Sequence, residues 1–262
     1  MSTREAAKRL LEAHERRERF APLPPGLAPR TAAEAYAIQD AFVALRAQTL
    51  GARAGYKIAL TSEAMRRFVG VDAPQAGVMH VSTLRRSPAR VRAADYVRLI
   101  VEFEVALLLA DDLPAAGKPY FRASVGRAVG AAMPGIEIAD DRNADYGELA
   151  KHPLELIADN AWNEGAVLGA PVTDWRRLDL AALRAAASVN GQPVGEGRGA
   201  DAMGHPLDAL AWLADHLASI GRGLVRGDVV MTGSLITSKT VTAGDAVAFT
   251  LEDLGTVELR VD

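Results

Sequence analysis

Two glutamates stand two residues apart in an apolar run, and they are the first feature of this sequence that could do chemistry. Glu102 and Glu104 lie within the segment Arg98–Ala110, which is otherwise rich in apolar residues. Side chains alternate along a strand, so both carboxylates are expected on the same face. Neighbouring carboxylates in apolar surroundings lose solvation and repel each other. The pattern indicates either a neutralising cation or an edge strand whose glutamates face solvent.

A third glutamate repeats this pattern in a second apolar run. Glu137 stands between Ile136 and Ile138, the chain has no cysteine, and its five histidines show no metal-binding spacing. Three carboxylates without softer ligands suit a hard cation such as Mg²⁺ or Mn²⁺. The sequence alone does not bring the two strands together, so solvent-facing glutamates stay an alternative interpretation.

One lysine has a setting that could support proton transfer. Lys57 lies in the short strand-like run Gly55–Leu60. A partly buried lysine with a lowered pKa can exchange protons with a substrate. The alternative is a lysine on the solvent face of an alternating strand, which is the more common arrangement.

A glycine-rich segment matches a nucleotide-binding pattern only in its letters. Gly195–Ala200 reads G-x-G-x-x-A, but it follows a predicted hairpin and no helix begins directly after it. We therefore expect a flexible glycine loop near a site. No G-x-S-x-G nucleophile motif occurs either.

The elements that must position these residues change character near residue 55. Before it, Ser2-x-x-Glu5 and Thr31-x-x-Glu34 have capping-box spacing, and Gly51 supplies a helix stop. Two helices are expected there, joined by the irregular proline-rich link Ala21–Arg30. Residues 1–54 are thus predicted to form an N-terminal helical region.

Strands dominate the remainder, residues 55–262, which we expect to form one catalytic unit. Asn190-Gly191 predicts a hairpin, and one helix is expected from Pro206 to Gly221. Regular β-α alternation is missing, which favours a mixed sheet folded on itself over a doubly wound parallel sheet. The predicted class is α/β in the mixed α+β sense. Expected strands cover residues 56–60, 98–110, 128–138, 229–231, 246–251 and 256–261.

Composition narrows the classes of partner. The 262-residue chain has a net charge of −3 with both signs interspersed, and no basic stripe predicts nucleic-acid binding. Its longest apolar stretch, Val105–Ala110, is too short to span a bilayer, and residues 1–20 lack a signal-peptide core. A soluble cytoplasmic protein with no nucleic-acid or membrane partner is expected.

Taken in order along the chain, these motifs resemble the 2-keto-4-pentenoate hydratase and 4-oxalocrotonate decarboxylase family of the fumarylacetoacetate hydrolase superfamily. The resemblance covers roughly residues 30 to 260. The similar segments are Gly55–Ser62, Gly70–Pro74, Glu102–Glu104, Glu137–Arg142, Ala158–Ala161, Val167–Gly169, Gly204–Pro206, Ala211–Ala214, Gly227–Asp228 and Thr232–Leu235.

The resemblance implies a fumarylacetoacetate hydrolase-like mixed β-roll core with flanking helices, and a homo-oligomer built from dimers. It implies Mg²⁺ or Mn²⁺ bound by Glu102, Glu104 and Glu137, with Lys57 as the proton-transfer residue. The implied activity is a metal-dependent lyase on a small 2-oxo acid or 2-hydroxydienoate, foremost a hydratase. Decarboxylation, C–C hydrolysis or a non-catalytic role as an assembly partner are the alternatives.

Six further residues are implied in substrate binding or in supporting the ligands: Gln75, Asp140, Arg142, Trp162, Thr232 and Ser234. Two of them depart from the family pattern, which commonly has aspartate at Gln75 and a small hydroxyl residue at Trp162. Glutamine cannot transfer a proton at neutral pH, and tryptophan fills volume that a substrate tail would use. We therefore expect Gln75 and Trp162 to line the pocket and to alter the substrate range.

Overall fold

The computed structural model describes residues 2–262, and seven α-helices lie in this range. Those at the N-terminus begin where the capping boxes predict, since the side chains of Ser2 and Thr31 accept hydrogen bonds from the backbone N–H groups of Glu5 and Glu34. The helices are α1 (Thr3–Glu15), α2 (Ala32–Leu50), α3 (Glu63–Val69), α4 (Arg122–Ala128), α5 (Tyr146–Leu149), α6 (Pro153–Ala158) and α7 (Pro206–Ser219).

The strands form most of the rest, as the sequence predicts for the region after residue 55. They are β1 (Arg53–Ala59), β2 (Gln75–His80), β3 (Leu84–Arg86), β4 (Ala89–Val91), β5 (Leu99–Leu109), β6 (Val129–Asp140), β7 (Asn163–Leu168), β8 (Arg184–Val189), β9 (Gln192–Arg198), β10 (Val229–Ser234), β11 (Lys239–Thr240), β12 (Ala246–Leu251) and β13 (Gly255–Val261).

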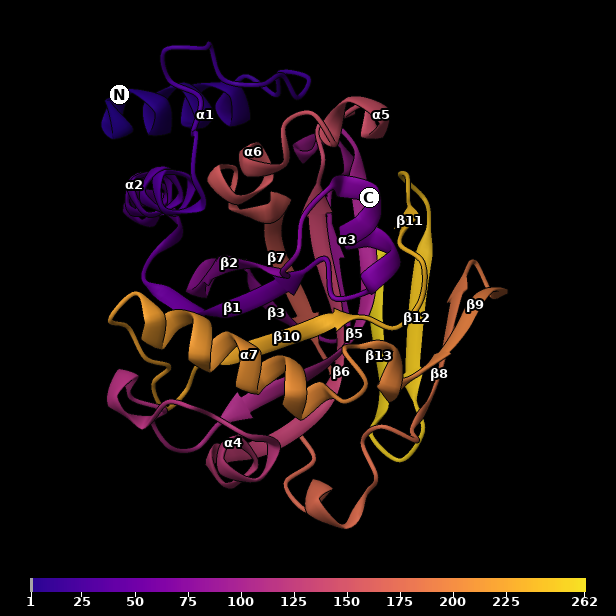
Figure 1. Ribbon diagram of the computed structural model, residues 1–262. Helices are drawn as coiled ribbons and strands as arrows, with labels where there is room; N and C mark the ends of the chain where they lie inside the picture. Colours follow the sequence, from indigo (N-terminus) through magenta and orange to yellow (C-terminus); the bar gives the residue numbers. More distant parts are fainter. Residues whose placement is uncertain (1) are drawn as a thin grey trace.

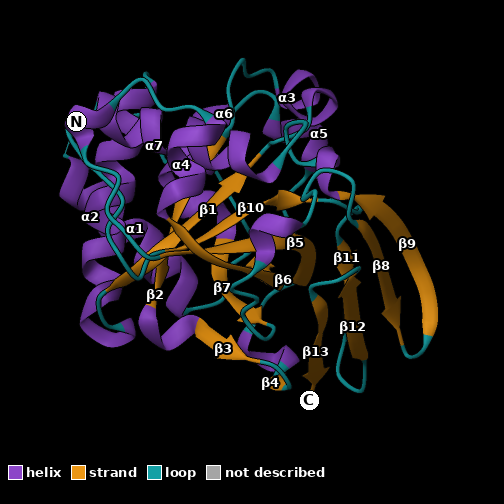
Figure 2. Ribbon diagram, turned by 90° about the horizontal axis from the view of Figure 1, so that it is seen from below, coloured by secondary structure: helices purple, strands orange, loops and turns teal. Residues whose placement is uncertain are grey.

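Two mixed sheets organise these strands, which confirms the predicted fold class. The larger sheet has the order β2-β1-β10-β5-β6-β7-β3, with β11 paired to β5. It is antiparallel except for the pairs β1–β10 and β3–β7. The smaller sheet has the order β4-β13-β12-β8-β9. Figure 2 shows the helices gathered around the larger sheet, with the smaller sheet on the other side.

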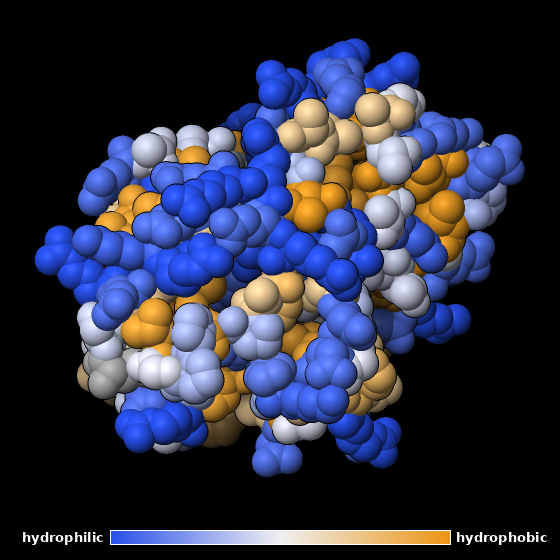
Figure 3. Space-filling model, turned by 90° about the horizontal axis from the view of Figure 1, so that it is seen from above, coloured by the Kyte–Doolittle hydropathy of each residue, from blue (hydrophilic) through white to orange (hydrophobic). Residues whose placement is uncertain are grey.

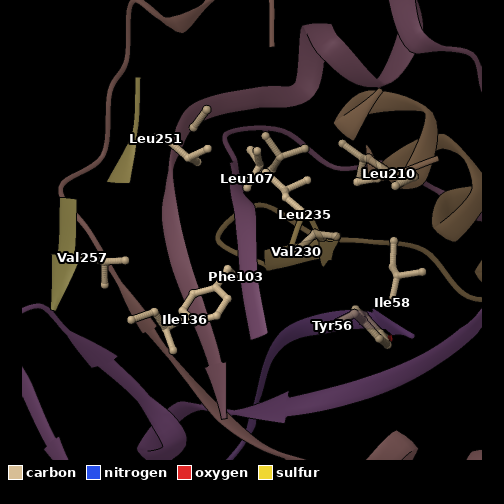
Figure 4. Packing of buried hydrophobic residues seen from close by; sticks show 14 of the residues in the cluster. Tyr56, Ile58, Phe103, Leu107, Ile136, Leu210, Val230, Leu235, Leu251 and Val257 are labelled. Carbon is tan, nitrogen blue, oxygen red and sulfur yellow. The ribbon is translucent and has the colours of Figure 1, made fainter. Parts of the chain in front are cut away.

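The main hydrophobic core lies between the two sheets and beneath α7. From β5, Phe103 and Leu107 point into it, and the Phe103 ring lies 5.4 Å from the Phe249 ring of β12. Figure 4 shows Val257 of the smaller sheet facing Ile136 and Phe103, with Leu210 of α7 on another side. Because strand side chains alternate, the residues between Phe103 and its core-facing neighbours must point to the opposite face of the sheet.

The N-terminal helices pack as a separate layer against α6 and the start of β7. Their apolar contacts form a second hydrophobic cluster, in which Ile38 and Phe42 of α2 meet Ile157 of α6. Figure 1 places α1 and α2 on one side of the molecule and β8 and β9 on the opposite side. An ion pair fixes this layer, since Arg46 of α2 binds both carboxylate oxygens of Glu164 in β7, at 2.9 and 2.5 Å.

The glycine-rich segment is not the flexible loop that the sequence predicted. Gly195 and Gly197 belong to β9, which pairs with β8 across the predicted Asn190-Gly191 hairpin. The glycines make room for a neighbouring segment, because a Cβ at Gly197 would lie 2.1 Å from the backbone oxygen of Leu235. This contact places β9 against the loop that follows β10.

The exterior is mixed in character. In the view of Figure 3, hydrophilic residues cover most of the face and hydrophobic residues form separate patches between them. Across residues 2–262, none of the helices combines the length and the apolar character that crossing a membrane requires.

Candidate active site

The register of β5 and β6 brings the three glutamates together on the face opposite the main core. Glu102 pairs directly with Glu137, and Glu104 pairs with Gly135. One carboxylate oxygen from each glutamate lies within 4.8 Å of the other two. Glu104 and Glu137 are fully buried and Glu102 is partly buried. The solvent-facing alternative is therefore wrong for Glu104 and Glu137.

Each buried carboxylate is held through one of its two oxygens. The backbone N–H of Gly233 donates to Oε2 of Glu104 at 2.7 Å. The side-chain amide of Asn163 donates to Oε1 of Glu137 at 2.9 Å, and Nζ of Lys57 lies 3.2 Å from the same oxygen. Within residues 2–262, Glu104 Oε1 and Glu137 Oε2 have no hydrogen-bond partner. Both carboxylates thus keep a buried acceptor free.

Burial and mutual repulsion make this cluster electrostatically costly. Burial raises the pKa of Glu137 to about 7, with Lys57 opposing the rise and Glu102 adding to it. Burial also raises the pKa of Glu104 well above its ordinary value, and the nearby Glu137 and Glu102 raise it further. One lysine does not balance three carboxylates.

A divalent cation fits this donor set. All three donors are carboxylate oxygens, which hard cations such as Mg²⁺, Mn²⁺ and Ca²⁺ prefer. Unpaired buried oxygens and repulsion between buried carboxylates are both unfavourable. A cation would bind the free oxygens of Glu104 and Glu137 and offset the repulsion among the three carboxylates. The residues present therefore suit a bound divalent metal.

Lys57 is buried beside the cluster, so the predicted solvent-facing alternative is also wrong for this residue. Its side chain runs over Gly77 of β2, where a Cβ would lie 3.1 Å from Cγ of Lys57. The sequence predicted a lowered pKa. Burial does lower the pKa of Lys57, but Glu137, Glu102 and Glu104 outweigh it and raise the pKa above its ordinary value. Among the protein's own groups, Lys57 is thus held as an ammonium.

A cavity of about 420 Å³ opens beside Lys57 and Glu102. Its wall is largely apolar, with contributions from β1, α3, α5, α6 and the loop after β10. Trp162 and Tyr146 form an aromatic part of this wall, with ring centroids 5.9 Å apart in an edge-on arrangement. Ser234 also lines the cavity. The position of Trp162 agrees with the expectation that it borders the pocket.

A turn of left-handed residues places Trp162 at the cavity and Asn163 beside Glu137. Asn160, Ala161 and Trp162 have φ values of 54, 49 and 58° in succession. Non-glycine residues rarely adopt this conformation, which costs about 1–2 kcal/mol per residue. The side chain of Asn160 compensates by accepting from the backbone N–H of Val78 and donating to its C=O, at 2.7 and 2.9 Å. The predicted family segment Ala158–Ala161 therefore shapes the site through its backbone.

Gln75 and Thr232 lie away from the cavity wall as the described residues define it. Gln75 is buried on β2, and its amide donates to the backbone oxygen of Pro153 at 3.3 Å. The expectation that Gln75 lines the pocket was wrong, because the turn and α6 cover this part of β2. The Thr232 hydroxyl donates to the backbone oxygen of Val105 at 2.8 Å and ties β10 to β5.

Asp140 and Arg142 hold the end of β6 in place and do not line the cavity formed by the described residues. Asp140 accepts backbone hydrogen bonds from Val97, Arg98 and Arg142, at 2.8 to 2.9 Å. Arg142 forms a buried ion pair with Asp159. These contacts brace the strand that carries Glu137, which is a supporting position.

Sequence reasoning missed two residues of the site, Asn163 and Tyr146. Asn163 begins β7 as a buried amide next to the polar Glu164, and no pattern in the sequence marked it. Tyr146 lines the cavity while its hydroxyl donates to Asp141 at 2.9 Å. Tyr146 lies in the short helix α5, for which the sequence offered no strong pattern.

Comparison with known proteins places this geometry in a family. Residues 48–262 match the family model described as the C-terminal domain of fumarylacetoacetate (FAA) hydrolase. The chain belongs to the fumarylacetoacetate hydrolase family. The fold and the resemblance predicted from the motifs are thereby confirmed.

Curated relatives and solved structures match along nearly the whole chain. A 2-keto-4-pentenoate hydratase from Paraburkholderia phymatum is 35% identical over 251 residues, covering 96% of this chain and 94% of the relative. A 2-hydroxyhexa-2,4-dienoate hydratase from Comamonas testosteroni is 33% identical, covering 97% and 95%. The structure of 4-oxalocrotonate decarboxylase from Pseudomonas putida G7, complexed with magnesium and adipate, superposes with a TM-score of 0.90 at 25% identity, covering 99% and 97%.

Proposed function

We propose that this chain is a divalent-metal-dependent hydratase that adds water to a 2-hydroxy-2,4-dienoate through its 2-oxo form. The observation that carries the proposal is the cluster of Glu102, Glu104 and Glu137, in which each of the two buried glutamates keeps a free carboxylate oxygen, while Glu102 and Lys57 line the cavity. The hydratases among the relatives support the reaction class.

The glutamates would hold Mg²⁺ or Mn²⁺, and the magnesium in the decarboxylase complex favours Mg²⁺. A divalent cation there would supply Lewis-acid stabilisation for negative charge on the oxygens of a 2-oxo acid. The protein contributes the shape of this site, because Asn163 and Lys57 together hold one oxygen of Glu137 and the Gly233 N–H holds one oxygen of Glu104.

Lys57 is the proposed proton-transfer residue. It is the only lysine or arginine among the described residues that line the cavity. As an ammonium it can give a proton to C5 when the dienol, whose hydroxyl proton passes to solvent, ketonises. The resulting amine can take a proton from the water that adds at C4 and pass it to C3 of the enolate formed by that addition, after which solvent restores the ammonium. Trp162, Tyr146 and Leu156 line the same cavity and would limit the access of water to this exchange.

The test follows the conjugated dienol directly. Purified protein is mixed with 2-hydroxypenta-2,4-dienoate, with Mg²⁺ or with EDTA, and the ultraviolet absorbance of the diene is recorded. The expected result is Mg²⁺-dependent loss of the chromophore and formation of 4-hydroxy-2-oxopentanoate, identified by NMR. A substrate that stays unchanged, with Mg²⁺ bound and related dienoates also tried, would refute the proposal.

Decarboxylation is the second candidate, favoured by the close superposition on 4-oxalocrotonate decarboxylase. The same assay with 4-oxalocrotonate, read as CO₂ release, separates it from hydration. We also propose a cytoplasmic homo-oligomer built from dimers, as the family resemblance implies. Light scattering on the purified chain tests the assembly, and a monomer at micromolar concentration would contradict it.

A further inference from the structure

We propose that the substrate of this enzyme carries an uncharged apolar tail longer than that of 2-hydroxypenta-2,4-dienoate, and no second carboxylate. The inference deepens the proposed function and rests on it for one point only. That point is the orientation of the ligand, whose 2-oxo acid end lies at Glu102 and Lys57.

The charges on the cavity wall argue against a dicarboxylate. Besides Lys57, the charged residues among the described lining are Glu102 and Asp201, which are both acids. Lys57 is already engaged by Glu137 at 3.2 Å. A second carboxylate on the ligand would therefore lose solvation without gaining a cationic partner.

The apolar wall supplies a binding surface for a tail. The segment from α5 to the left-handed turn contributes Leu149, Leu156 and Trp162, which pack in one apolar cluster with Val69 of α3, and the loop after β10 contributes Ile236. Of these, Leu149, Leu156, Val69 and Ile236 have no polar side-chain atom to satisfy. Each methylene that moves from water into such a site strengthens binding by about fourfold.

The size of the cavity points to a tail of several carbons. Its volume of about 420 Å³ lies within the range of about 300–1,000 Å³ that is typical of small-molecule sites. A five-carbon 2-oxo acid has only eight non-hydrogen atoms, which is small for a site of this size. If the ligand left the apolar part of the cavity unfilled, the side chains there would lack the van der Waals contacts that a longer tail provides.

Binding of unreactive 2-oxo acids tests the inference without requiring turnover. Dissociation constants are measured by calorimetry with the Mg²⁺-loaded full-length protein. 2-Oxooctanoate is expected to bind about 10-fold or more tightly than 2-oxopentanoate. 2-Oxohexanedioate is expected to bind at least about 10-fold more weakly than 2-oxohexanoate, which has the same number of carbons. Equal or tighter binding of the dicarboxylate, or weaker binding of the longer tail, would overturn the proposal.

A pair of variants on α3 locates the wall that meets the tail. Met65 lines the cavity and is 39% exposed, so Met65→Lys adds a cation there without burying it. Phe68, on the same helix, is 51% exposed and is not among the described lining residues, which makes Phe68→Lys the matched control. Met65→Lys should narrow the preference for 2-oxohexanoate over 2-oxohexanedioate by about fivefold, and Phe68→Lys should leave it unchanged. Equal shifts in both variants would overturn the assignment of α3 to this wall.

The two proposals fail in different ways. Hydration of dienoates together with a preference for dicarboxylates would leave the function standing and refute the tail assignment. The expected order of affinities without hydration of any dienoate would support the tail assignment and refute the function.

Discussion

A single oxygen, Oε1 of Glu137, accepts both the Asn163 amide and the Lys57 ammonium. Two donors on one side of a carboxylate fix its plane and leave the other oxygen directed away from them. The backbone N–H of Gly233 likewise holds one oxygen of Glu104 and leaves the other oxygen free. At the scale of residues, the site is therefore oriented by neutral and cationic donors that do not themselves bind a metal.

Replacing Lys57 should separate turnover from folding. In Lys57→Met the proton donor is lost while the side-chain stem is kept, so hydration should slow by about 10²–10⁴-fold. The melting temperature in saturating Mg²⁺ should change little. Lys118→Met, at an exposed position, is the control and should keep wild-type kinetics. Wild-type turnover in Lys57→Met would remove Lys57 from the mechanism.

Removing the Asn163 amide should weaken metal binding more than it harms the fold. Without this donor, Glu137 Oε1 loses one of its two partners, and such supporting hydrogen bonds are worth about 10–100-fold in metal affinity. We expect Asn163→Ala to raise the Mg²⁺ dissociation constant by that factor, measured by calorimetry. The exposed Gln48→Ala change is the matched control. An unchanged dissociation constant would show that Asn163 does not position Glu137.

At the scale of elements, a buried ionic network ties the N-terminal helices to the strand that carries Asn163. His14 of α1 lies 2.6 Å from Asp159 and 3.2 Å from Glu164, and Arg46 of α2 binds Glu164 as well. Burial by itself lowers the pKa of His14, but Asp159 and Glu164 outweigh it and raise the pKa to about 9. The charged imidazolium thus helps to dock α1.

This network predicts a loss of stability in alkaline solution. The folded protein holds the His14 proton more tightly than the unfolded chain, whose histidine pKa is about 6.5. The contribution is complete below about pH 6.5 and is lost as the pH rises through about 9. It amounts to at most about 3 kcal/mol of unfolding free energy.

Urea unfolding between pH 6 and pH 10 measures this effect. The unfolding free energy of the wild-type protein should fall between pH 6 and pH 10. The unfolding free energy of His14→Gln should fall by less over the same range. His152→Gln, at the start of α6, is the control and should keep the wild-type slope. The same slope in His14→Gln as in the wild type would rule out His14 as its source.

The sequence predicted the elements whose signals are local. Capping boxes located α1 and α2, apolar runs located β5 and β6, and Asn-Gly located the β8–β9 turn. The same local signals placed Glu102 and Glu104 on one face, which the structure confirms.

What the sequence could not supply depends on contacts between distant segments. Whether Glu137 meets Glu102 is decided by strand pairing, and the burial of Gln75 is decided by α6 and the turn that cover it. Three left-handed residues without glycine, Asn160–Trp162, carry no local signal, because their strain is offset by bonds to Val78 in another strand.

At the scale of the whole molecule, the site joins β1, β10, β5, β6 and β7, so a bound metal should stabilise the entire fold. A ligand at about 100 times its dissociation constant adds about 2.7 kcal/mol to the unfolding free energy. For a chain of this size, that corresponds to a rise of about 5–10 °C in melting temperature. Melting in Mg²⁺ and in EDTA measures the difference, and Glu102→Gln should reduce it. Equal melting temperatures in Mg²⁺ and EDTA, at concentrations that support turnover, would contradict a shared metal site.

The direct pairing of Glu102 with Glu137 also constrains how this lineage can change over time. Each of the two strands has an apolar core on one face and the carboxylates on the other, so one inserted or deleted residue would turn every following side chain to the wrong face. Point substitutions in the cavity wall carry no such penalty. Insertions and deletions are instead tolerated in the connection between β6 and β7, which contains α5 and α6. Tyr146 and Leu156 of this connection line the cavity. New substrate ranges should therefore arise from changes in the length of that connection, on a catalytic frame whose strand lengths stay fixed.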